Sequence, residues 1–235
     1  MKRLAVICAR GGSKGIAGKN LMNLAGKPLL GYSLEQANEA GLFDAVAVSS
    51  DSQQILDLAR DLGADHLVER PAELATDAAP KVPAIRHCTE LVENELAVRF
   101  DTIVDLDATS PLRNRDDIKG AVGLLESSDA TNVVTAMPSR RSPYFNLVEL
   151  ADDQTVHLSK PLPTSVARRQ DSPPSYDLNA SVFVWRRKAL FEGGDSVFGE
   201  RTRLYVMPEE RSIDIDTMTD FKFVEYLMAE RASMS

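Results

Sequence analysis

The stretch from Val6 to Asn20, "VICARGGSKGIAGKN", joins a short apolar run to a loop of glycines and cations. The apolar run, residues 4–9, predicts a buried strand. The loop alternates glycine with cationic side chains and contains no acidic residue, its members being Arg10, Gly12, Lys14, Gly15, Gly18 and Lys19. In α/β proteins a glycine loop between a strand and a helix binds phosphates, because backbone N–H groups can approach the anion. We therefore expect a phosphate site here.

Outward from this loop, apolar runs alternate with stretches of helical period. Strands are expected at residues 4–9, 45–49, 66–68, 102–106, 132–137, 181–185 and 204–207. Helices are expected at residues 28–40, 53–62, 82–98, 116–125 and 219–230. This alternation predicts an α/β fold with a mainly parallel sheet covered by helices. The length of 235 residues fits a single domain spanning 1–235.

The alternation breaks at about residues 138–178, a stretch rich in proline, arginine and serine. Long irregular stretches within a domain are usually functional or disordered. Tyr144, Phe145 and Leu147 lie inside this stretch, and apolar side chains of this size need burial. We therefore expect an inserted arm that contacts a second copy of the chain in a homodimer.

The charge balance limits the partners. A formal net charge of −8 argues against binding nucleic acid or an acidic membrane. No apolar stretch approaches the roughly 20 residues of a membrane helix, and the first apolar run is too short for a signal peptide. Cys8 and Cys88 are expected to be buried, reduced thiols. The sequence therefore indicates a cytoplasmic protein whose basic loop binds a small anion.

The loop fits neither of two familiar phosphate motifs. Walker A needs Ser or Thr after its Gly-Lys pair, and here Asn20 follows Gly18-Lys19. The dinucleotide fingerprint needs Gly-x-Gly-x-x-Gly, a spacing these glycines lack. A plain glycine turn is the alternative, but it does not explain the density of cations.

A second motif, "SIDIDTMTD", places Asp214 and Asp216 two residues apart, each preceded by isoleucine. In an extended chain such positions share a face, so both carboxylates point the same way while Ile213 and Ile215 pack inward. Paired carboxylates beside a phosphate loop suit Mg²⁺. The alternative is an exposed acidic face with Asp216 as the N-cap of the last helix. Asp220 is a weaker candidate ligand.

Four motifs together resemble the CMP-sugar synthetases, the cytidylyltransferases that activate sialic acid and related nine-carbon 2-keto sugar acids. In order they are "ARGGSKGIAGKNL", "RPAELATD", "TSPLR" and "SIDIDTMTD". The resemblance implies a Rossmann-like fold of the nucleotide-sugar transferase type with a dimerisation arm. It also implies CTP as substrate with Mg²⁺ or Mn²⁺ as cofactor. The reaction would be attack of the sugar C2 hydroxyl on the α-phosphate of CTP, with release of pyrophosphate.

The resemblance also implies roles for individual residues. The catalytic residues would be Arg10, Lys19 and Asp216. CTP would be bound by Arg10, Gly12, Ser13, Lys14, Lys19, Asn20 and Arg70, with Arg70 reading the cytosine; a surface salt bridge is the alternative for Arg70. The sugar acid would be bound by Asp107, Thr109, Arg169, Tyr176, Asp177 and Asn179, with Arg169 holding its carboxylate. The metal ligands would be Asp214 and Asp216.

Two departures bear on the sugar. Sialic acid synthetases have glutamine where this chain has Asp107 and arginine where it has Asp177. Buried carboxylates need hydrogen-bond donors, and a diacylamino sugar supplies more N–H donors than N-acetylneuraminate does. With the wording of "DLDATSPLR" and "YDLNAS", this favours the branch that activates legionaminic acid, with N-acetylneuraminic acid next. The alternatives are a Kdo-type cytidylyltransferase, or a nucleotide-binding regulatory protein without catalysis.

Overall fold

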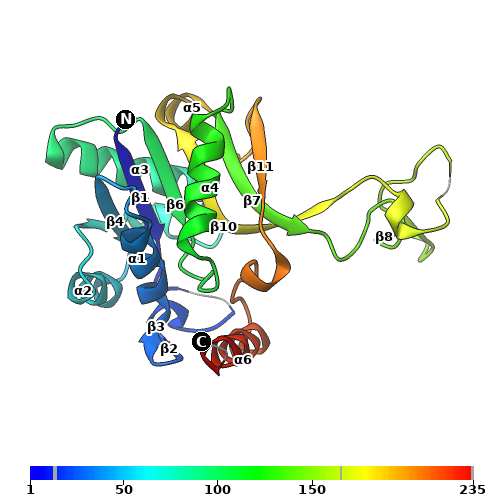
Figure 1. Ribbon diagram of the computed structural model, residues 1–235, viewed down its shortest axis with the longest axis horizontal. Coiled ribbons are helices and arrows are strands. Elements are labelled where there is room, and N and C mark those ends of the chain that lie inside the picture. Colours follow the sequence, from blue (N-terminus) through cyan, green and yellow to red (C-terminus); the bar gives the residue numbers. More distant parts are fainter. Residues whose placement is uncertain (13–14, 165, 234–235) are drawn as a thin grey trace.

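The computed structural model describes residues 1–12, 15–164 and 166–233. Its centre is a seven-stranded sheet in the order β11-β7-β10-β6-β1-β4-β5 (Figure 1). Its strands are β1 (Arg3–Cys8), β4 (Ala45–Ser50), β5 (His66–Glu69), β6 (Thr102–Leu106), β7 (Asn132–Pro138), β10 (Tyr176–Arg186) and β11 (Thr202–Val206). β10 runs antiparallel to β6 and β7, while the other paired strands of this sheet are parallel. The expected mainly parallel α/β sheet is confirmed.

Helices cover both faces of the sheet. One face carries α1 (Leu29–Ala40), α2 (Gln53–Asp61) and α4 (Arg115–Glu126), and the other carries α3 (Lys81–Leu96) and α5 (Arg187–Glu192). α6 (Met218–Ser233) packs below the glycine loop, in a separate apolar cluster that includes Ile16 and Ile215. A hairpin of β2 (Asn23–Leu24) and β3 (Lys27–Pro28) separates the loop from α1. The sequence did not predict this hairpin or α5.

Local sequence explains where several elements begin and end. β1 contains a run of four fully buried residues, Leu4 to Ile7, because helices cover it on both sides. α4 begins with a capping box, in which Asn114 accepts the N–H groups of Asp116 and Asp117 and Asp117 accepts the N–H of Asn114. α1 ends at Gly41, whose φ of 62° is left-handed.

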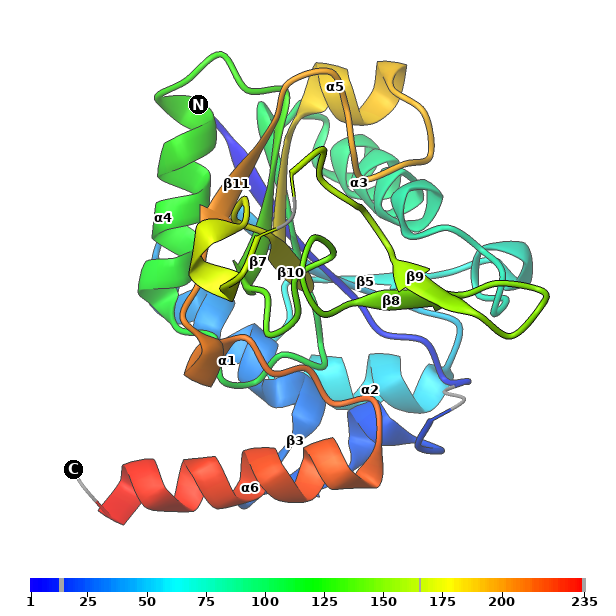
Figure 2. The same cartoon turned by 90° about the vertical axis from the view of Figure 1, so that its right-hand side faces the viewer.

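The segment expected to be an inserted arm projects from the body of the molecule. β7 and β10 extend beyond the sheet, and the chain between them carries a small hairpin of β8 (Val148–Leu150) and β9 (Val156–Leu158) (Figures 1 and 2). Tyr144 and Phe145 are half-buried, but the side chain of Leu147 is 45% exposed. Within one chain Leu147 is exposed because the arm reaches away from the apolar core, so its burial against a second copy stays a prediction.

Within residues 1–12, 15–164 and 166–233, no helix combines the length and the hydropathy that a bilayer crossing requires.

A buried carboxylate ties α3 to α5. Glu93 accepts two bonds from Arg187, at 2.7 and 2.8 Å, one from Arg99 at 2.9 Å, and one from the Phe100 N–H at 3.1 Å. Burial opposes ionisation of Glu93, but the bonds from Arg187 and Phe100 outweigh it and lower its pKa. A lowered pKa contributes stability above the pKa of the unfolded chain, which is lost as pH falls through the folded value.

We expect Glu93→Gln to lower the free energy of unfolding by about 2–4 kcal/mol at pH 7, because it removes the carboxylate to which Arg187 is directly bonded. The loss should shrink below about pH 4, where the wild-type carboxylate itself becomes protonated. Urea unfolding at pH 7 and at about pH 3 measures both values, with Glu39→Gln on the exposed side of α1 as matched control. A pH-independent difference would contradict the role of the charge.

Candidate active site

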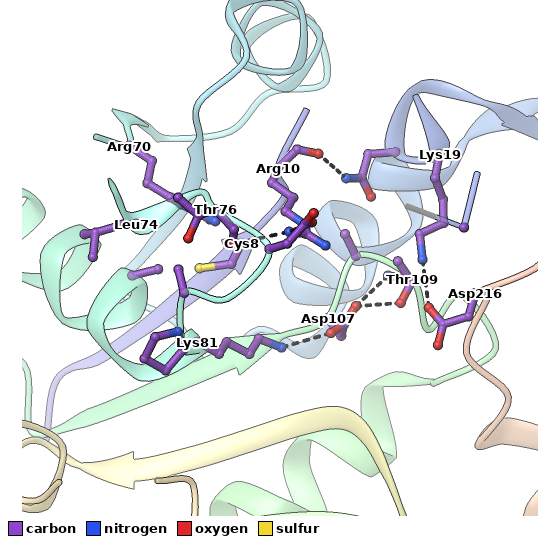
Figure 3. A pocket seen from close by; sticks show the side chains of 17 residues that line it. Cys8, Arg10, Lys19, Arg70, Leu74, Thr76, Lys81, Asp107, Thr109 and Asp216 are labelled. Carbon is purple, nitrogen blue, oxygen red and sulfur yellow. Dashed lines mark hydrogen bonds and ion pairs between the residues drawn. The ribbon is translucent and has the colours of Figure 1, made fainter. Parts of the chain in front are cut away.

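A cavity of about 500 Å³ opens where β1, β5 and β6 reach their carboxyl ends (Figure 3). Ligands of open α/β sheets bind at this edge. The cavity is lined by Cys8, Arg10, Gly15, Lys19, Asn20, Arg70, Leu74, Thr76, Asp77, Ala79, Pro80, Lys81, Ala84, Asp107, Ala108, Thr109 and Asp216. Residues from all four sequence motifs thus line one cavity.

The glycine loop packs directly against that segment. A Cβ on Gly15 would lie 2.0 Å from the backbone oxygen of Asp216, so only glycine fits there. Lys19 is buried, and its ammonium donates to the backbone oxygen of Ile215 and, at 3.1 Å, to Asp216 Oδ1. Lys19 therefore joins the two motifs that carry all three predicted catalytic residues.

Arg10 and Asn20 lie on the same side of the cavity. The side chain of Asn20 donates to the backbone oxygen of Arg10 at 3.1 Å, which fixes the start of the loop. The Arg10 guanidinium is engaged by the segment after β5, at 2.8 Å from Asp77 Oδ1 and 3.4 Å from the Thr76 oxygen. The Asp77 carboxylate is thus paired with Arg10, the cation that the sequence assigns to the triphosphate.

The structure assigns no strand to residues 212–216, and of the two aspartates predicted to share a face, Asp216 lines the cavity and Asp214 is not among the lining residues. Ile215 is fully buried, and its N–H donates to the Thr109 oxygen at 2.9 Å. Asp216 projects outward with 73% of its side chain exposed. Asp214 is half-buried, and burial together with the charge of Asp216 raises its pKa. A carboxylate whose ionisation is disfavoured by a neighbouring carboxylate is a favourable place for a cation.

The alternative reading of Asp216 as the N-cap of α6 is wrong. The carboxylate of Asp220 accepts the N–H groups of Thr217 at 2.7 Å and of Asp216 at 3.2 Å, and Thr217 Oγ1 accepts the Asp220 N–H in return. Thr217 and Asp220 therefore cap the helix, and the Asp216 carboxylate remains directed at the cavity.

The donor set fits Mg²⁺ or Mn²⁺ bound together with phosphates. Among the described residues there is no cluster of three or more His, Cys, Asp or Glu side chains that could hold a metal ion. Mg²⁺, however, is usually held by one or two carboxylates together with substrate phosphates and waters. Asp214 and Asp216 would supply the carboxylates, and the metal would neutralise charge on the transferring phosphoryl group.

Arg70 comes directly after β5 and is buried, so the alternative of a surface salt bridge is wrong. Its Nε donates to Ser49 Oγ at 3.1 Å and its Nη2 to the Ser49 oxygen at 2.8 Å. These bonds hold the guanidinium at the cavity wall opposite Lys19 (Figure 3). A fixed guanidinium at this place can donate to a base carbonyl.

Asp107 and Thr109 follow β6 and form the floor of the cavity. Asp107 Oδ1 accepts the N–H and the hydroxyl of Thr109, at 2.9 and 2.7 Å. Its Oδ2 accepts a bond from Lys81 at 2.9 Å. These interactions with Lys81 and Thr109 outweigh burial and hold the pKa of Asp107 well below its usual range. The protein itself thus supplies most of the donors that we expected a sugar to supply.

The four other predicted sugar-binding residues do not line this cavity. Arg169 donates to the Ser139 oxygen within the arm, and Tyr176 is exposed. Asp177 is exposed rather than buried and accepts from Ser139 Oγ at 2.6 Å. Their contact with a sugar remains a prediction, and the expected burial of Asp177 is wrong.

Asn179 is buried, but its polar groups are used within the fold. Its Oδ1 accepts from Thr135 Oγ1 at 2.7 Å, and its Nδ2 donates to Ser212 Oγ at 3.0 Å. In this structure it anchors β10 to β7 and to the chain before Ile213 rather than facing the cavity.

Two predicted CTP-binding residues, Ser13 and Lys14, lie outside the described residues. Gly12 is described and is exposed at the start of the loop.

Sequence reasoning assigned no role to Asp77, Lys81 or Cys8, all of which line the cavity. Cys8 is partly exposed there, contrary to its expected burial, while Cys88 is buried as expected. The protein around Cys8 still removes much of its contact with water, and this desolvation raises the pKa of the Cys8 thiol to about 11.

An α/β sheet with a cationic glycine loop at the carboxyl ends of its strands, and a carboxylate segment packed against that loop, is typical of proteins that bind nucleotide phosphates. Residues 4–233 match the family model described as cytidylyltransferase. The chain belongs to this cytidylyltransferase family and is a nucleotidyltransferase.

Two relatives match along nearly their whole length. CMP-N,N'-diacetyllegionaminic acid synthase of Campylobacter jejuni is 41% identical over 226 residues, which are 96% of this chain and 94% of that protein. Post-translational flagellin modification protein B of Campylobacter coli is 40% identical over 228 residues, 97% of this chain and 95% of that protein. The solved structure of CMP:2-keto-3-deoxy-manno-octonic acid synthetase complexed with CTP has a TM-score of 0.71 at 18% identity, covering 98% of this chain and 100% of that one. This structural likeness establishes the shared fold.

The Arg10–Asp77 pair leads to a prediction about CTP. We expect Asp77→Asn to lower KM for CTP by about two- to fivefold, because phosphates then no longer compete with a carboxylate for Arg10, and exposed pairs are worth about 0.2–1 kcal/mol. Asp77→Glu keeps the charge and is the matched control. Initial rates over a range of CTP concentrations give KM, and a raised KM in Asp77→Asn would show instead that Asp77 supports the bound nucleotide.

Proposed function

We propose that this enzyme transfers CMP from CTP to legionaminic acid, a nine-carbon 2-keto sugar acid with two acylamino groups. The sugar C2 hydroxyl forms a bond to the α-phosphorus while the bond to the bridging oxygen breaks. Pyrophosphate leaves with the electron pair, and the hydroxyl proton is released. Such a transfer depends on positioning and charge neutralisation more than on covalent catalysis.

One observation carries this proposal: a single cavity joins the cations of the glycine loop, the fixed guanidinium of Arg70, and the polar floor at Asp107. A triphosphate, a base and a polar sugar each meet a matching group there. Arg10 and Lys19 would hold the phosphate oxygens as charge moves to the leaving pyrophosphate. Asp214 and Asp216 would hold Mg²⁺ or Mn²⁺ against the same phosphates.

The choice of sugar acid is supported by the named synthase of Campylobacter jejuni, with its 41% identity over 226 residues. Since CTP is a nucleotide of the cytoplasm, we place the enzyme there.

The proposal is tested by pyrophosphate release from CTP with three acceptors: N,N'-diacetyllegionaminic acid, N-acetylneuraminic acid and Kdo. We expect the highest kcat/KM with the diacetyl sugar and no release with ATP in place of CTP. Equal or better use of N-acetylneuraminic acid would overturn the choice of sugar. Preference for Kdo would indicate the eight-carbon branch of these enzymes. Binding of CTP without release of pyrophosphate in the presence of any of the acceptors would indicate a regulatory protein.

The arm motivates a further prediction, a homodimer. Its hairpin exposes apolar side chains on a projecting segment, with Val148, Leu150 and Val156 between 54% and 64% exposed. A symmetric contact between two arms would cover these side chains in both copies of the chain. We expect light scattering at micromolar concentration to give twice the 25.7 kDa chain mass. Leu150→Glu with Val156→Glu should shift the mass toward the monomer, and a wild-type monomer would contradict the proposal.

A further inference from the structure

Three charged side chains form a cluster at the floor of the cavity, which we call the Lys81 triad: Lys81, Asp105 and Asp107. Lys81 is the first residue of α3, and its ammonium lies 2.6 Å from Asp105 Oδ2 and 2.9 Å from Asp107 Oδ2. The side chain of Asp105 is fully buried, while about a quarter of the surface of the other two side chains is open to the cavity. The sequence motifs assigned a role to Asp107 alone.

Asp105 is costly where it stands. It lies inside β6, whose five residues are all buried, and it is paired in register with Val6 on one side and Phe183 on the other. Neither of its carboxylate oxygens receives a well-directed hydrogen bond from the described residues, so the ion pair with Lys81 is its main compensation. A well-packed apolar residue would stabilise such a position as well or better. The cost points to a use for the ammonium that Asp105 holds.

The triad retains hydrogen-bonding capacity toward the cavity. An ammonium has three N–H donors, and the described partners of Lys81 account for two of them; its remaining contact is with the Phe183 ring, whose centroid lies 5.6 Å away. Asp107 accepts one bond from Lys81 and two from Thr109, and a carboxylate has about four acceptor positions. One donor and one acceptor therefore remain side by side.

The charge of the triad decides what kind of group it can receive. The Lys81 ammonium and the two carboxylates lie near the buried guanidinium of Arg113, whose charge acts on both carboxylates, so the cluster has no excess positive charge to attract a phosphate or a sugar carboxylate. The cations of the glycine loop, Arg10 and Lys19, are on the other side of the same space (Figure 3). The floor is thus suited to a neutral group that accepts one hydrogen bond and donates another, and an amide does both.

We propose that Lys81 is a specificity-determining residue, whose ammonium donates to the carbonyl oxygen of the acylamino group that legionaminic acid has and N-acetylneuraminic acid lacks. Asp107 accepts the N–H of an acylamino group beside it, and Asp105 is a positioning residue that holds the ammonium in place. This inference rests on the proposed function for its choice of sugar.

The first test is Lys81→Met, which keeps the length of the side chain and removes its donors. We expect KM for diacetyllegionaminic acid to rise about tenfold or more, the effect of losing a hydrogen bond to a charged group. KM for CTP should stay within about twofold. The ratio of kcat/KM for diacetyllegionaminic acid to that for N-acetylneuraminic acid should fall by the same factor by which KM for diacetyllegionaminic acid rises. Lys81→Arg should restore part of the preference. Lys119→Met, on the exposed side of α4, is the matched control.

Two results would overturn the inference: an equal loss for both sugars, or a rise in KM for CTP instead of for the sugar acid. Asp105→Asn separates positioning from support of the fold, since it keeps the shape but removes the counter-charge. A positioning role predicts a raised KM for the sugar at an unchanged melting temperature, and a structural role predicts the reverse. If the wild type prefers a different sugar acid, the proposed function fails, and the same variants then test Lys81 on the KM of that substrate.

Discussion

Replacing Asp216 with asparagine is expected to lower kcat by about a hundredfold or more, because it removes a carboxylate that would hold the metal against the transferring phosphate. The fold should be little affected, since 73% of this side chain is exposed and the cap of α6 is provided by Asp220. Steady-state rates over a range of Mg²⁺ concentrations should show a higher concentration for half-maximal activity.

Asp220→Asn is the matched control for this variant. It weakens the cap of α6, which costs about 1 kcal/mol of stability, and it changes a carboxylate that bonds the Asp216 N–H but is not among the residues that line the cavity. We expect it to unfold at lower denaturant concentration while keeping the wild-type Mg²⁺ dependence. An Asp216→Asn enzyme with normal kcat and normal Mg²⁺ dependence would remove Asp216 from the metal site.

Lys19→Met is expected to lower kcat/KM by about a hundred- to a thousandfold, the range seen when one donor to a developing charge is removed. Lys19 is buried between the two motifs, so the change removes both a cation for the triphosphate and the bonds to Ile215 and Asp216. Pyrophosphate release at low CTP concentration measures this loss directly.

Lys27→Met is the matched control, because Lys27 is part of an exposed pair with Glu35 on the hairpin beside the same loop. We expect it to change kcat/KM less than twofold, given the small worth of surface pairs. A Lys19→Met enzyme with more than a tenth of wild-type activity would show that other cations carry the charge.

The sheet and its helices could be predicted because they are encoded locally. Runs such as residues 102–106 and periodic stretches such as residues 53–62 appear as β6 and α2, within a residue of their expected bounds. The antiparallel direction of β10 could not be predicted in this way. The apolar pattern of residues 181–185 does not record the direction of the strand, because both of its faces are buried whether it runs parallel or antiparallel to β6.

The site could be predicted in part, and the division has a physical reason. Arg10 and Lys19 stand in a loop that combines cations with glycines, and Asp216 stands in a motif that alternates aspartate with isoleucine, so their meeting around one cavity was expected. Lys81 and Asp105 are single charged residues within a helix and an apolar strand, and only the fold brings their atoms within 2.6 Å. The arm residues Arg169 and Asp177 were assigned by resemblance, and a single chain leaves them apart from the cavity.

The place of β10 in the sheet has a consequence for synthesis on the ribosome. β7 is made before both strands that flank it, β10 and β11, because the sheet order is β11-β7-β10-β6. Until residues 176–186 have emerged, β7 has neither of its partners in the sheet, and nascent chains with unpaired strands are prone to aggregate. The half of the sheet built from β1, β4, β5 and β6 can pair much earlier. β10 then supplies the Phe183 ring beneath the Lys81 ammonium, so the floor of the cavity is completed only after the whole arm has been translated.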